Sequence, residues 1–489
     1  MSGTAVLNCA PSQSFDAQPA ATVRLSEVIA ALSCALDITE GQPEGHSARS
    51  CMIAMRLAEE LQLDVADRSA LFYALLLKDL GCSSNSAKMC YLFGADDRTI
   101  KHDLKAVDWS RMTDSLRFVH EQVAPHGSPL ERLMKVASMA LQGPSGPRKL
   151  VETRCERGAE IARQLGFPEA TARAILDLDE HWDGKGHPQG LQGQQIFLLG
   201  RIAGLAQTVD VFQHELSPQA ALAMARERSG RWFDPQLVRA LESVAADGMF
   251  WRELNEPEIL GCVSAYEPEE HSRLIDQSGL DRVAEGFARV VDAKSPWTQK
   301  HSAGVSRIAV SIGKQLGLSA AALRSVRRAG LLHDIGKLGV SNLILDKPAK
   351  LTRIEFSAMR KHPEFTQRIL EQVSEFSDIA EIAGGHHEKL DGSGYPRGIL
   401  SGDLPIAARL LTVSDIYEAL TSARPYRDAM PTEKVLRIMR KQAGKTICGE
   451  SFAALEQVVE REQFENRMEA QLEALAQLAE ELGTYSIAG

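Results

Sequence analysis

Five of the thirteen histidines of this 489-residue sequence lie between residues 301 and 387, and Asp334 and Asp415 accompany them. Imidazole nitrogens and carboxylate oxygens together bind Mn, Fe, Zn and similar divalent cations, and a carboxylate can bridge two of them. A single histidine is more often a hydrogen-bonding group than a ligand. A cluster that includes the neighbours His386 and His387 instead favours a metal centre over scattered surface histidines. The candidate ligands are His301, His333, Asp334, His362, His386, His387 and Asp415.

The adjacent pair His333-Asp334 indicates how two cations would share this cluster. On a helix, His333 would bind one cation and Asp334 would bridge both. Lys337 follows His333 by four residues, so it would point the same way and meet a phosphate oxygen. Two bound cations lower the pKa of a water and offset the charge of a phosphodiester. We therefore expect in-line hydrolysis of a phosphodiester, with Asp334 and Lys337 as catalytic residues.

The elements that must position these residues are predicted to be helices. Segments such as ARSCMIAMRLAEELQL, TARAILDLDEHW and SVRRAGLLHDIGKLGV repeat apolar residues at spacings of three and four. Alternating strand patterns with Asn-Gly or Asp-Gly turns are hard to find. The fold class expected from this pattern is all-α.

The sequence also contains an internal duplication. His46 precedes Lys78 by 32 residues, the same separation as between His301 and His333. A later block containing DGKGHP in the first half matches one containing DGSGYP in the second without a gap. Matched spacings of this kind predict two tandem copies of one helical unit. The first copy carries about 47 additional residues between its Lys78-Asp79 pair and this block.

Breaks in the helical pattern divide the chain into five predicted segments. Small and polar residues at the start indicate a loose tail, and Pro, Gly and acidic residues interrupt the periodicity between the copies. Near the end, a stripe made of Leu472, Leu475, Leu478 and Leu482 predicts a docking helix. The segments are a tail (1–23), a first domain (24–245), a linker (246–278), a catalytic domain (279–462) and a C-terminal amphipathic helix (463–489).

Composition excludes several classes of function. A net charge of −10 argues against binding to a nucleic-acid polymer, which needs a basic face. No apolar run is long enough to span a bilayer, and the N-terminus lacks the basic region of a secretory signal, so we expect a cytoplasmic protein without a membrane segment. The eight cysteines form no CxxC pair and are expected to be reduced.

The second copy resembles the HD-GYP branch of the HD phosphohydrolase superfamily. The motifs are LLHDIGK (331–337), KHPE (361–364), HHEKLDGSGYPRG (386–398) and SDIYEALTSARPYR (414–427), in the family's order and spacing, and the resemblance runs from about 280 to 440. It implies an all-helical phosphodiesterase that hydrolyses cyclic di-GMP to pGpG or GMP with bound iron or manganese.

The resemblance also implies a role for each matching residue. The seven candidate ligands match the family's metal ligands, and Lys337 matches a lysine near the scissile phosphate. The residues that match the dinucleotide pocket are Gly394, Tyr395, Pro396, Arg424 and Arg427. Arginine forks suit phosphate oxygens and a tyrosine ring can stack on guanine, although a solvated basic face is the alternative for the two arginines.

Two departures qualify the resemblance. Family members with three metals carry a glutamate four residues before the first ligand histidine, where this sequence has Trp297, so two divalent ions are expected. A Phe-Asp-Pro motif near the domain's end is present in the first copy as 233–235, but the second copy has Ile447-Cys448-Gly449. Because Asp is a good N-cap, this change is expected to alter a helix start and leave the metals alone.

The first copy is expected to bind no metal. Lys78 replaces the ligand histidine, and a lysine there would place a cation where a metal would sit. The remaining positions carry Arg154, Leu178, Asp179 and Gln207, and His181 and His187 have no second cluster beside them. We expect this copy to pack on the second, bind a ligand or mediate dimerisation.

Two alternatives remain open at this point. HD proteins also cleave ordinary nucleotides, although the GYP and RPYR segments favour a cyclic dinucleotide. The chain could instead be a signalling scaffold that contacts protein partners or a second copy of itself through the first domain or the C-terminal helix. Complete metal ligands count against a purely scaffolding role.

Overall fold

The computed structural model describes residues 23–108, 111–125, 127–142, 145–423 and 427–485. As predicted, these residues fold almost entirely into helices, and the only sheet among them joins two-residue strands, β1 (Val23–Arg24) and β2 (Leu274–Ile275). None of the described helices is both long and apolar enough to cross a membrane.

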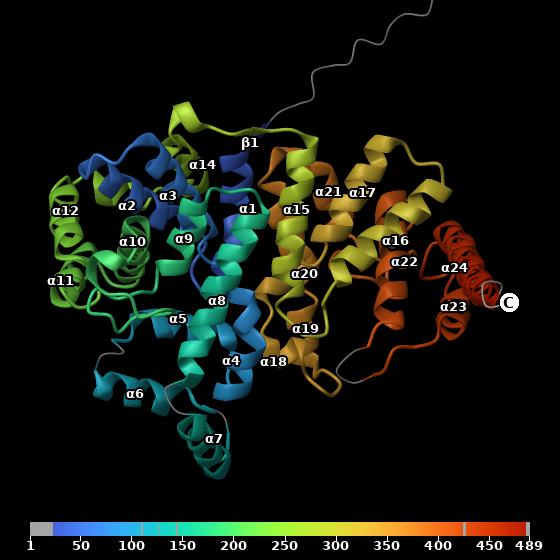
Figure 1. Cartoon of the computed structure of the whole chain (residues 1–489), viewed down its shortest axis with the longest axis horizontal. Helices are drawn as coiled ribbons and strands as arrows, with labels where there is room; N and C mark the ends of the chain where they lie inside the picture. Colours follow the sequence, from blue (N-terminus) through green and yellow to red (C-terminus); the bar gives the residue numbers. More distant parts are fainter. Residues whose placement is uncertain (1–22, 109–110, 126, 143–144, 424–426, 486–489) are drawn as a thin grey trace, which may run out of the picture.

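The duplication seen in the sequence appears as two sets of helices that begin at matching positions. In the first copy they are α1 (Leu25–Thr39), α2 (His46–Glu60), α3 (Val65–Leu77), α9 (Glu169–Asp177), α10 (Leu198–Glu215), α11 (Pro218–Arg228) and α12 (Pro235–Ala245). Their counterparts are α15 (Gln277–Asp292), α16 (His301–Gln315), α17 (Ala320–Leu332), α21 (Ser377–Gly384), α22 (Ile406–Thr421), α23 (Thr432–Arg440) and α24 (Gly449–Tyr485). The two sets lie side by side in Figure 1, the first blue to green and the second yellow to red.

Caps and close packing explain why the helices begin and turn where they do. The Asp64 carboxylate accepts a hydrogen bond from the Asp67 amide at the start of α3, and Ser319 does the same for Ala322 in α17. Asp234 caps α12 of the first copy, whereas α24 begins at Gly449 after the buried Cys448. Helix α24 begins at the position that matches the start of α12, so the altered helix start expected in the second copy stays a prediction.

One apolar core runs through both copies without interruption. Helix α1 packs against α20 (His362–Glu371) and against the 3₁₀ segment η5 (Ile335–Gly339), both of which belong to the second copy. The first copy therefore packs directly against two of the elements that carry or adjoin the predicted ligands.

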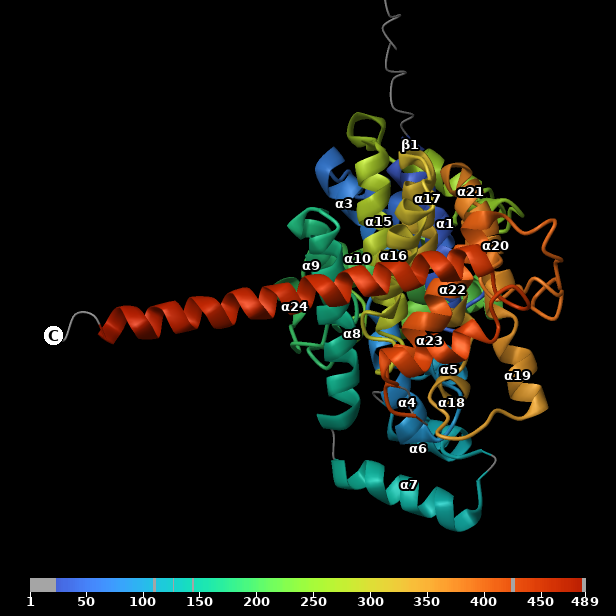
Figure 2. The ribbon, with the colours of Figure 1, turned by 90° about the vertical axis from the view of Figure 1, so that its right-hand side faces the viewer.

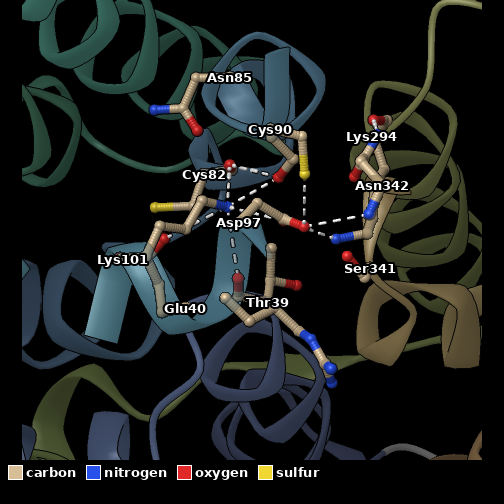
Figure 3. Close-up of polar contacts among 12 residues, drawn as sticks. Thr39, Glu40, Cys82, Asn85, Cys90, Asp97, Lys101, Lys294, Ser341 and Asn342 are labelled. Atoms are coloured by element: carbon tan, nitrogen blue, oxygen red, sulfur yellow. Dashed lines mark hydrogen bonds and ion pairs between the residues drawn. The ribbon is translucent and has the colours of Figure 1, made fainter. Parts of the chain in front are cut away.

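The additional residues of the first copy form α4 (Ser86–Phe93), α5 (Asp97–Ala106), α6 (Met112–Gln122) and α7 (Pro129–Gln142) and lead into α8 (Ser145–Gln164). Helix α5 reaches the second copy, as Figure 3 shows. The Asp97 carboxylate lies 3.2 Å from Lys294 Nζ and accepts a 3.1 Å hydrogen bond from the Asn342 amide. Arg98 donates to the Gly339 carbonyl at 2.6 Å. No motif or spacing in the sequence indicated this contact.

The segment predicted as a linker is folded onto the first copy. It contains α13 (Phe250–Glu253), α14 (Ile259–Val263), η3 (Ser264–Tyr266) and η4 (Glu269–His271). Strand β2 pairs antiparallel with β1, and Glu267 accepts hydrogen bonds from Ser26 at 2.7 Å and Tyr73 at 2.5 Å.

Helix α24 is continuous, with no break at residue 463. Its first part buries Phe452, Leu455 and Val459 and packs against α16 and α22. Figure 2 shows the rest of the helix extending away from the body. The leucine side chains predicted to form a docking stripe lie outside the described residues, so that prediction is untested.

Candidate metal centre

Five elements of the second copy bring the predicted ligands together. His301 begins α16, His362 begins α20, and Asp415 lies in the middle of α22. The pair His386-His387 follows α21. All seven predicted ligands fall into groups whose candidate atoms lie within 4.8 Å of one another: His301, His333 and Asp415; His333, Asp334 and His386; and His362, His386 and His387.

The His333-Asp334 pair lies at a break between helices and not within one. Helix α17 ends at Leu332 and the 3₁₀ segment η5 starts at Ile335. Gly336 makes this break possible, because a Cβ there would lie 2.0 Å from the carbonyl oxygen of His362. The turn therefore places the pair directly against the start of α20.

Asp334 occupies the middle of the cluster. One carboxylate oxygen, Oδ2, lies 3.5 Å from His301 Nε2 and 3.3 Å from His333 Nε2. The other, Oδ1, lies 3.4 Å from His362 Nε2 and 3.7 Å from His386 Nε2. Asp334 thus faces histidines on both sides, the arrangement expected of a bridging ligand.

Hydrogen bonds fix the orientation of the rings. His333, His362 and His386 each donate from Nδ1 to a backbone carbonyl, of Gly330 at 2.9 Å, Met359 at 2.7 Å and Ala383 at 2.5 Å. Because a carbonyl can only accept, Nδ1 carries the proton and Nε2 is left with a lone pair that faces the cluster. His301 donates from Nδ1 to the Glu418 carboxylate. Such partners are typical of metal-binding histidines.

The electrostatics favour the metal-binding form at several ligands but not at His301. Burial lowers the pKa of His301, but Asp334, Asp415 and Glu418 together raise it well above its ordinary value. Burial lowers the pKa of His362 to about 3 and that of His386 to about 4, with nearby Lys337 and His333 acting in the same direction. Burial raises the pKa of Asp334, but His333, Lys337 and His301 together bring it well below its ordinary value. Neutral imidazole and ionised carboxylate are the protonation states that metal ligation requires.

The residues fit divalent cations. Among the described residues, neither His333 Nε2 nor Asp334 Oδ1 has a hydrogen-bond partner, although both atoms are buried. Buried polar atoms are costly without a partner, and a cation would satisfy both. Nitrogen and carboxylate donors without thiolate suit iron, manganese or zinc. Trp297, at the position of a third-metal glutamate, is 41% exposed and belongs to none of these ligand groups.

The predicted substrate-binding residues surround this cluster unequally. Lys337 Nζ lies 2.6 Å from Asp334 Oδ2 and remains partly exposed. The Tyr395 ring lies 4.8 Å from the His387 ring, and Gly394 packs so closely against Lys389 that it has no room for a Cβ. Pro396 follows Tyr395 on the same loop.

The two predicted arginines have different outcomes. Arg424 lies outside the described residues. Arg427 donates to the carbonyls of Ala419, Leu420 and Asp428 at 2.7–2.9 Å, so it holds the end of α22 in this structure. A contact of Arg427 with phosphate would have to replace these hydrogen bonds, and it stays a prediction.

The equivalent place in the first copy is filled by cations. A Cβ on Gly81 would lie 1.9 Å from the Arg154 carbonyl, which matches Gly336 and His362 and makes Arg154 the counterpart of His362. Lys78 pairs with Asp79, and Lys105 lies 3.4 Å from Glu40 and 4.0 Å from Asp79.

These ion pairs bear on whether the first copy could hold a metal ion of its own. Glu40, Asp79 and Cys82 lie close enough to hold an ion, but Lys78, Lys105 and Arg154 already neutralise the carboxylates. His181 stacks on Trp232 at 4.1 Å, and burial lowers its pKa to about 4. Lysines and an arginine therefore pair with the carboxylates at the place in the first copy that matches the cluster, and the absence of a metal there stays a prediction.

Comparison with known proteins agrees with the site. The profile of a family described as HD domain matches residues 128–237 and 285–449, which is more than half of the chain. The 3'3'-cGAMP-specific phosphodiesterase 3 of Vibrio cholerae is 43% identical over 438 residues, which cover 90% of this chain and 95% of the relative. The chain belongs to the HD domain family, in its HD-GYP branch.

Other relatives of this HD-GYP protein match mainly over shorter stretches. A cyclic di-GMP phosphodiesterase response regulator of Xanthomonas campestris pv. campestris is 36% identical over 161 residues, or 32% of this chain and 43% of its own length.

A solved structure also matches over almost the whole chain. The crystal structure of a cyclic GMP-AMP-specific phosphodiesterase from Vibrio cholerae covers 90% of this chain and 98% of that one, with a TM-score of 0.64 and 38% identity.

Three residues were not predicted, one at the metal centre and two at the matching place in the first copy. Glu418 contacts the first ligand histidine, and Asp210 holds His46 in the same way at 2.7 Å in the first copy. The repeat offered a usable signal, because Asp210 and Glu418 each lie three residues after matched positions, Gln207 and Asp415. Lys105 was missed because it comes from the additional residues, which have no counterpart in the second copy.

Proposed function

We propose that this chain is a metal-dependent phosphodiesterase of cyclic dinucleotides, with residues 279–462 as the catalytic domain and 24–245 as a metal-free domain packed against it. The observation that carries the proposal is the position of Asp334, whose two carboxylate oxygens face histidines on opposite sides. The seven predicted ligands would hold two divalent ions, with iron or manganese as the first choice.

The chain's own residues bind and orient the substrate. Bound metals supply a water of lowered pKa and offset charge on the phosphodiester. Lys337 is partly exposed and lies beside Asp334, so its ammonium group meets a phosphate oxygen placed at the cluster. Tyr395 offers its ring to a base. The histidine Nδ1–H groups hold the ligand rings in place, so little reorganisation is needed when the substrate binds.

For the substrate, we propose 3'3'-cGAMP, because the relative that covers almost the whole chain is specific for that molecule. Cyclic di-GMP is the second candidate, supported by the resemblance of the motifs and by cyclic di-GMP phosphodiesterases that match about a third of the chain. The product would be a linear dinucleotide such as pGpG in the case of cyclic di-GMP, or the mononucleotides.

A substrate panel tests the proposal. Chain purified without oxygen and loaded with Fe or Mn is offered 3'3'-cGAMP, cyclic di-GMP, cyclic di-AMP, GTP and dGTP, and products are resolved by chromatography. We expect turnover of cyclic dinucleotides, with the highest kcat/KM for 3'3'-cGAMP. Cleavage of GTP or dGTP alone would make the chain an ordinary nucleotide phosphohydrolase. Metal binding without any turnover would instead support a signalling scaffold.

A further inference from the structure

A groove beside the metal centre is lined by Pro396, which matches the family's dinucleotide pocket, and otherwise by residues that have no role in the function proposed so far. Its volume is about 380 Å³, within the range of small-ligand sites. It lies between α19 (Arg353–Met359), the start of α20 and the Gly-Tyr-Pro loop. The lining residues used below are Phe356, Arg360, Glu364 and Pro396.

The groove is connected to the metal centre through Tyr395. The Tyr395 ring lies 4.8 Å from His387 on one side and 6.3 Å from the Phe356 ring on the other. Phe356 is 47% exposed, so part of its ring is open to a ligand in the groove. Because Tyr395 meets Phe356 edge-on at 77°, a planar ligand can stack on the Phe356 ring within the groove.

The polar groups of the groove are available to a ligand. Arg360 packs its guanidinium 5.0 Å from the Tyr395 ring and 6.0 Å from the Phe356 ring. Within the described part of the chain, Arg360 and Glu364 form no ion pair, either with each other or with another residue, and both are exposed. An arginine fork and a free carboxylate four residues apart therefore border one aromatic wall.

This set of groups matches one nucleobase better than the others. Guanine presents acceptors at O6 and N7, which an arginine fork binds, and donors at N1 and N2, which a carboxylate accepts. Adenine has an amino donor at C6, which would oppose the arginine fork, and an acceptor at N1, which would oppose the carboxylate, so only its N7 would be satisfied by the fork. We propose that the groove is a guanine subsite, in which Phe356 stacks on the base, Arg360 binds O6 and N7, and Glu364 accepts from N1 and N2.

The residues at the matching positions of the first copy support a binding role for the groove. Where the second copy breaks the chain between α19 and α20, the first has one continuous helix, α8. By the register that equates Arg154 with His362, Arg148 replaces Phe356 and Glu152 replaces Arg360. Arg148 donates to the Pro188 carbonyl at 3.1 Å and pairs with Glu152 at 2.9 Å. The stacking ring and the available fork thus occur in the copy that has the metal ligands.

The inference rests on the proposed function for its substrate, and its test separates the two. Phe356→Ala, Arg360→Ala, Arg360→Lys and Glu364→Gln are compared with wild type and with Arg324→Ala, an exposed arginine on α17 that does not line the groove. KM and kcat are measured for 3'3'-cGAMP, cyclic di-GMP and bis(p-nitrophenyl) phosphate, a small phosphodiester without a purine. Binding of GMP and AMP is measured by calorimetry.

We expect each groove variant to raise KM for both cyclic dinucleotides about ten-fold, the effect of losing one stacked or fork contact, with hydrolysis of the small phosphodiester unchanged. Arg360→Lys should not rescue, because a lysine lacks the fork. GMP should bind wild type more tightly than AMP and lose that advantage in Arg360→Ala. Rescue by lysine, equal loss on all substrates, or unchanged KM and GMP binding would each overturn the subsite. Absence of cyclic dinucleotide turnover in wild type, with GMP selectivity intact, would overturn the proposed function alone.

Discussion

At the scale of single residues, the catalytic site depends on how Asp334 is surrounded. Histidines approach both of its oxygens, and Lys337 lies 2.6 Å from one of them. The clustering of the seven candidate ligands and Lys337 could be expected from the sequence, because the residue types and the family motifs mark them. The partners of their Nδ1 atoms could not, since backbone carbonyls carry no sequence signal.

Lys337→Met should lower kcat by about 100-fold and leave the metal content unchanged, because the ammonium group stabilises charge on the phosphodiester and is not a ligand. Metal analysis and steady-state kinetics on the same preparation check this. Lys314→Met, at an exposed lysine on α16, is the matched control. Loss of metal in Lys337→Met would show that the lysine supports the ligands instead.

Glu418→Gln should weaken metal binding by about 10- to 100-fold, since a glutamine can still accept from His301 Nδ1 but no longer raises the basicity of the ring. Titration with Mn²⁺ measures the effect, and Glu433→Gln on the exposed face of α23 provides the control. An unchanged metal affinity would mean that the Glu418 charge does not affect how His301 binds metal.

At the scale of elements, the break at His333 is what the sequence did not reveal. The helical pattern of 325–340 predicted that the His-Asp pair would lie on one helix, but α17 ends at Leu332. The cause is a long-range contact, the close approach of Gly336 to His362, and helical periodicity within one segment carries no information about it. The helix starts, by contrast, followed local caps such as Asp64 and Ser319.

Gly336→Ala should destabilise the chain by about 1–3 kcal/mol and reduce metal occupancy, because the new methyl group would meet a backbone carbonyl that cannot move aside cheaply. Thermal unfolding and metal analysis test this against Gly402→Ala, where a Cβ would meet nothing within 4 Å. Full metal occupancy in Gly336→Ala would show that η5 can shift without disturbing the ligands.

At the scale of the whole molecule, the two copies share one core, and the additional residues of the first copy reach the second. The sequence predicted the duplication and the all-helical class, and the metal-free first copy stays a prediction. The docking of α5 could not be predicted, because it joins Asp97 to residues about 200 positions away and nothing in the repeat marks them.

Asp97→Asn should destabilise the chain by about 3 kcal/mol at pH 7, because Lys294 would be left buried without its carboxylate. Burial raises the pKa of Asp97, but Lys294 and Lys101 bring it below its ordinary value. A carboxylate with a lowered pKa stabilises the fold above its unfolded pKa of about 4, and this contribution is lost as the pH falls below that value.

Urea unfolding of wild type and Asp97→Asn at pH 7 and at successively lower pH below 4 checks this prediction. The difference in unfolding free energy should shrink as the pH falls. Asp103→Asn, at a half-buried aspartate on the same helix, serves as a comparison. A constant difference across this range would contradict the account of the interface.

The most direct test of the central claim compares wild type with Asp334→Ala after purification without oxygen, with metal content and turnover of 3'3'-cGAMP and cyclic di-GMP measured on the same samples. The account predicts about two metal ions per wild-type chain, hydrolysis of a cyclic dinucleotide, and loss of both in the variant. Full turnover by metal-loaded Asp334→Ala would contradict it.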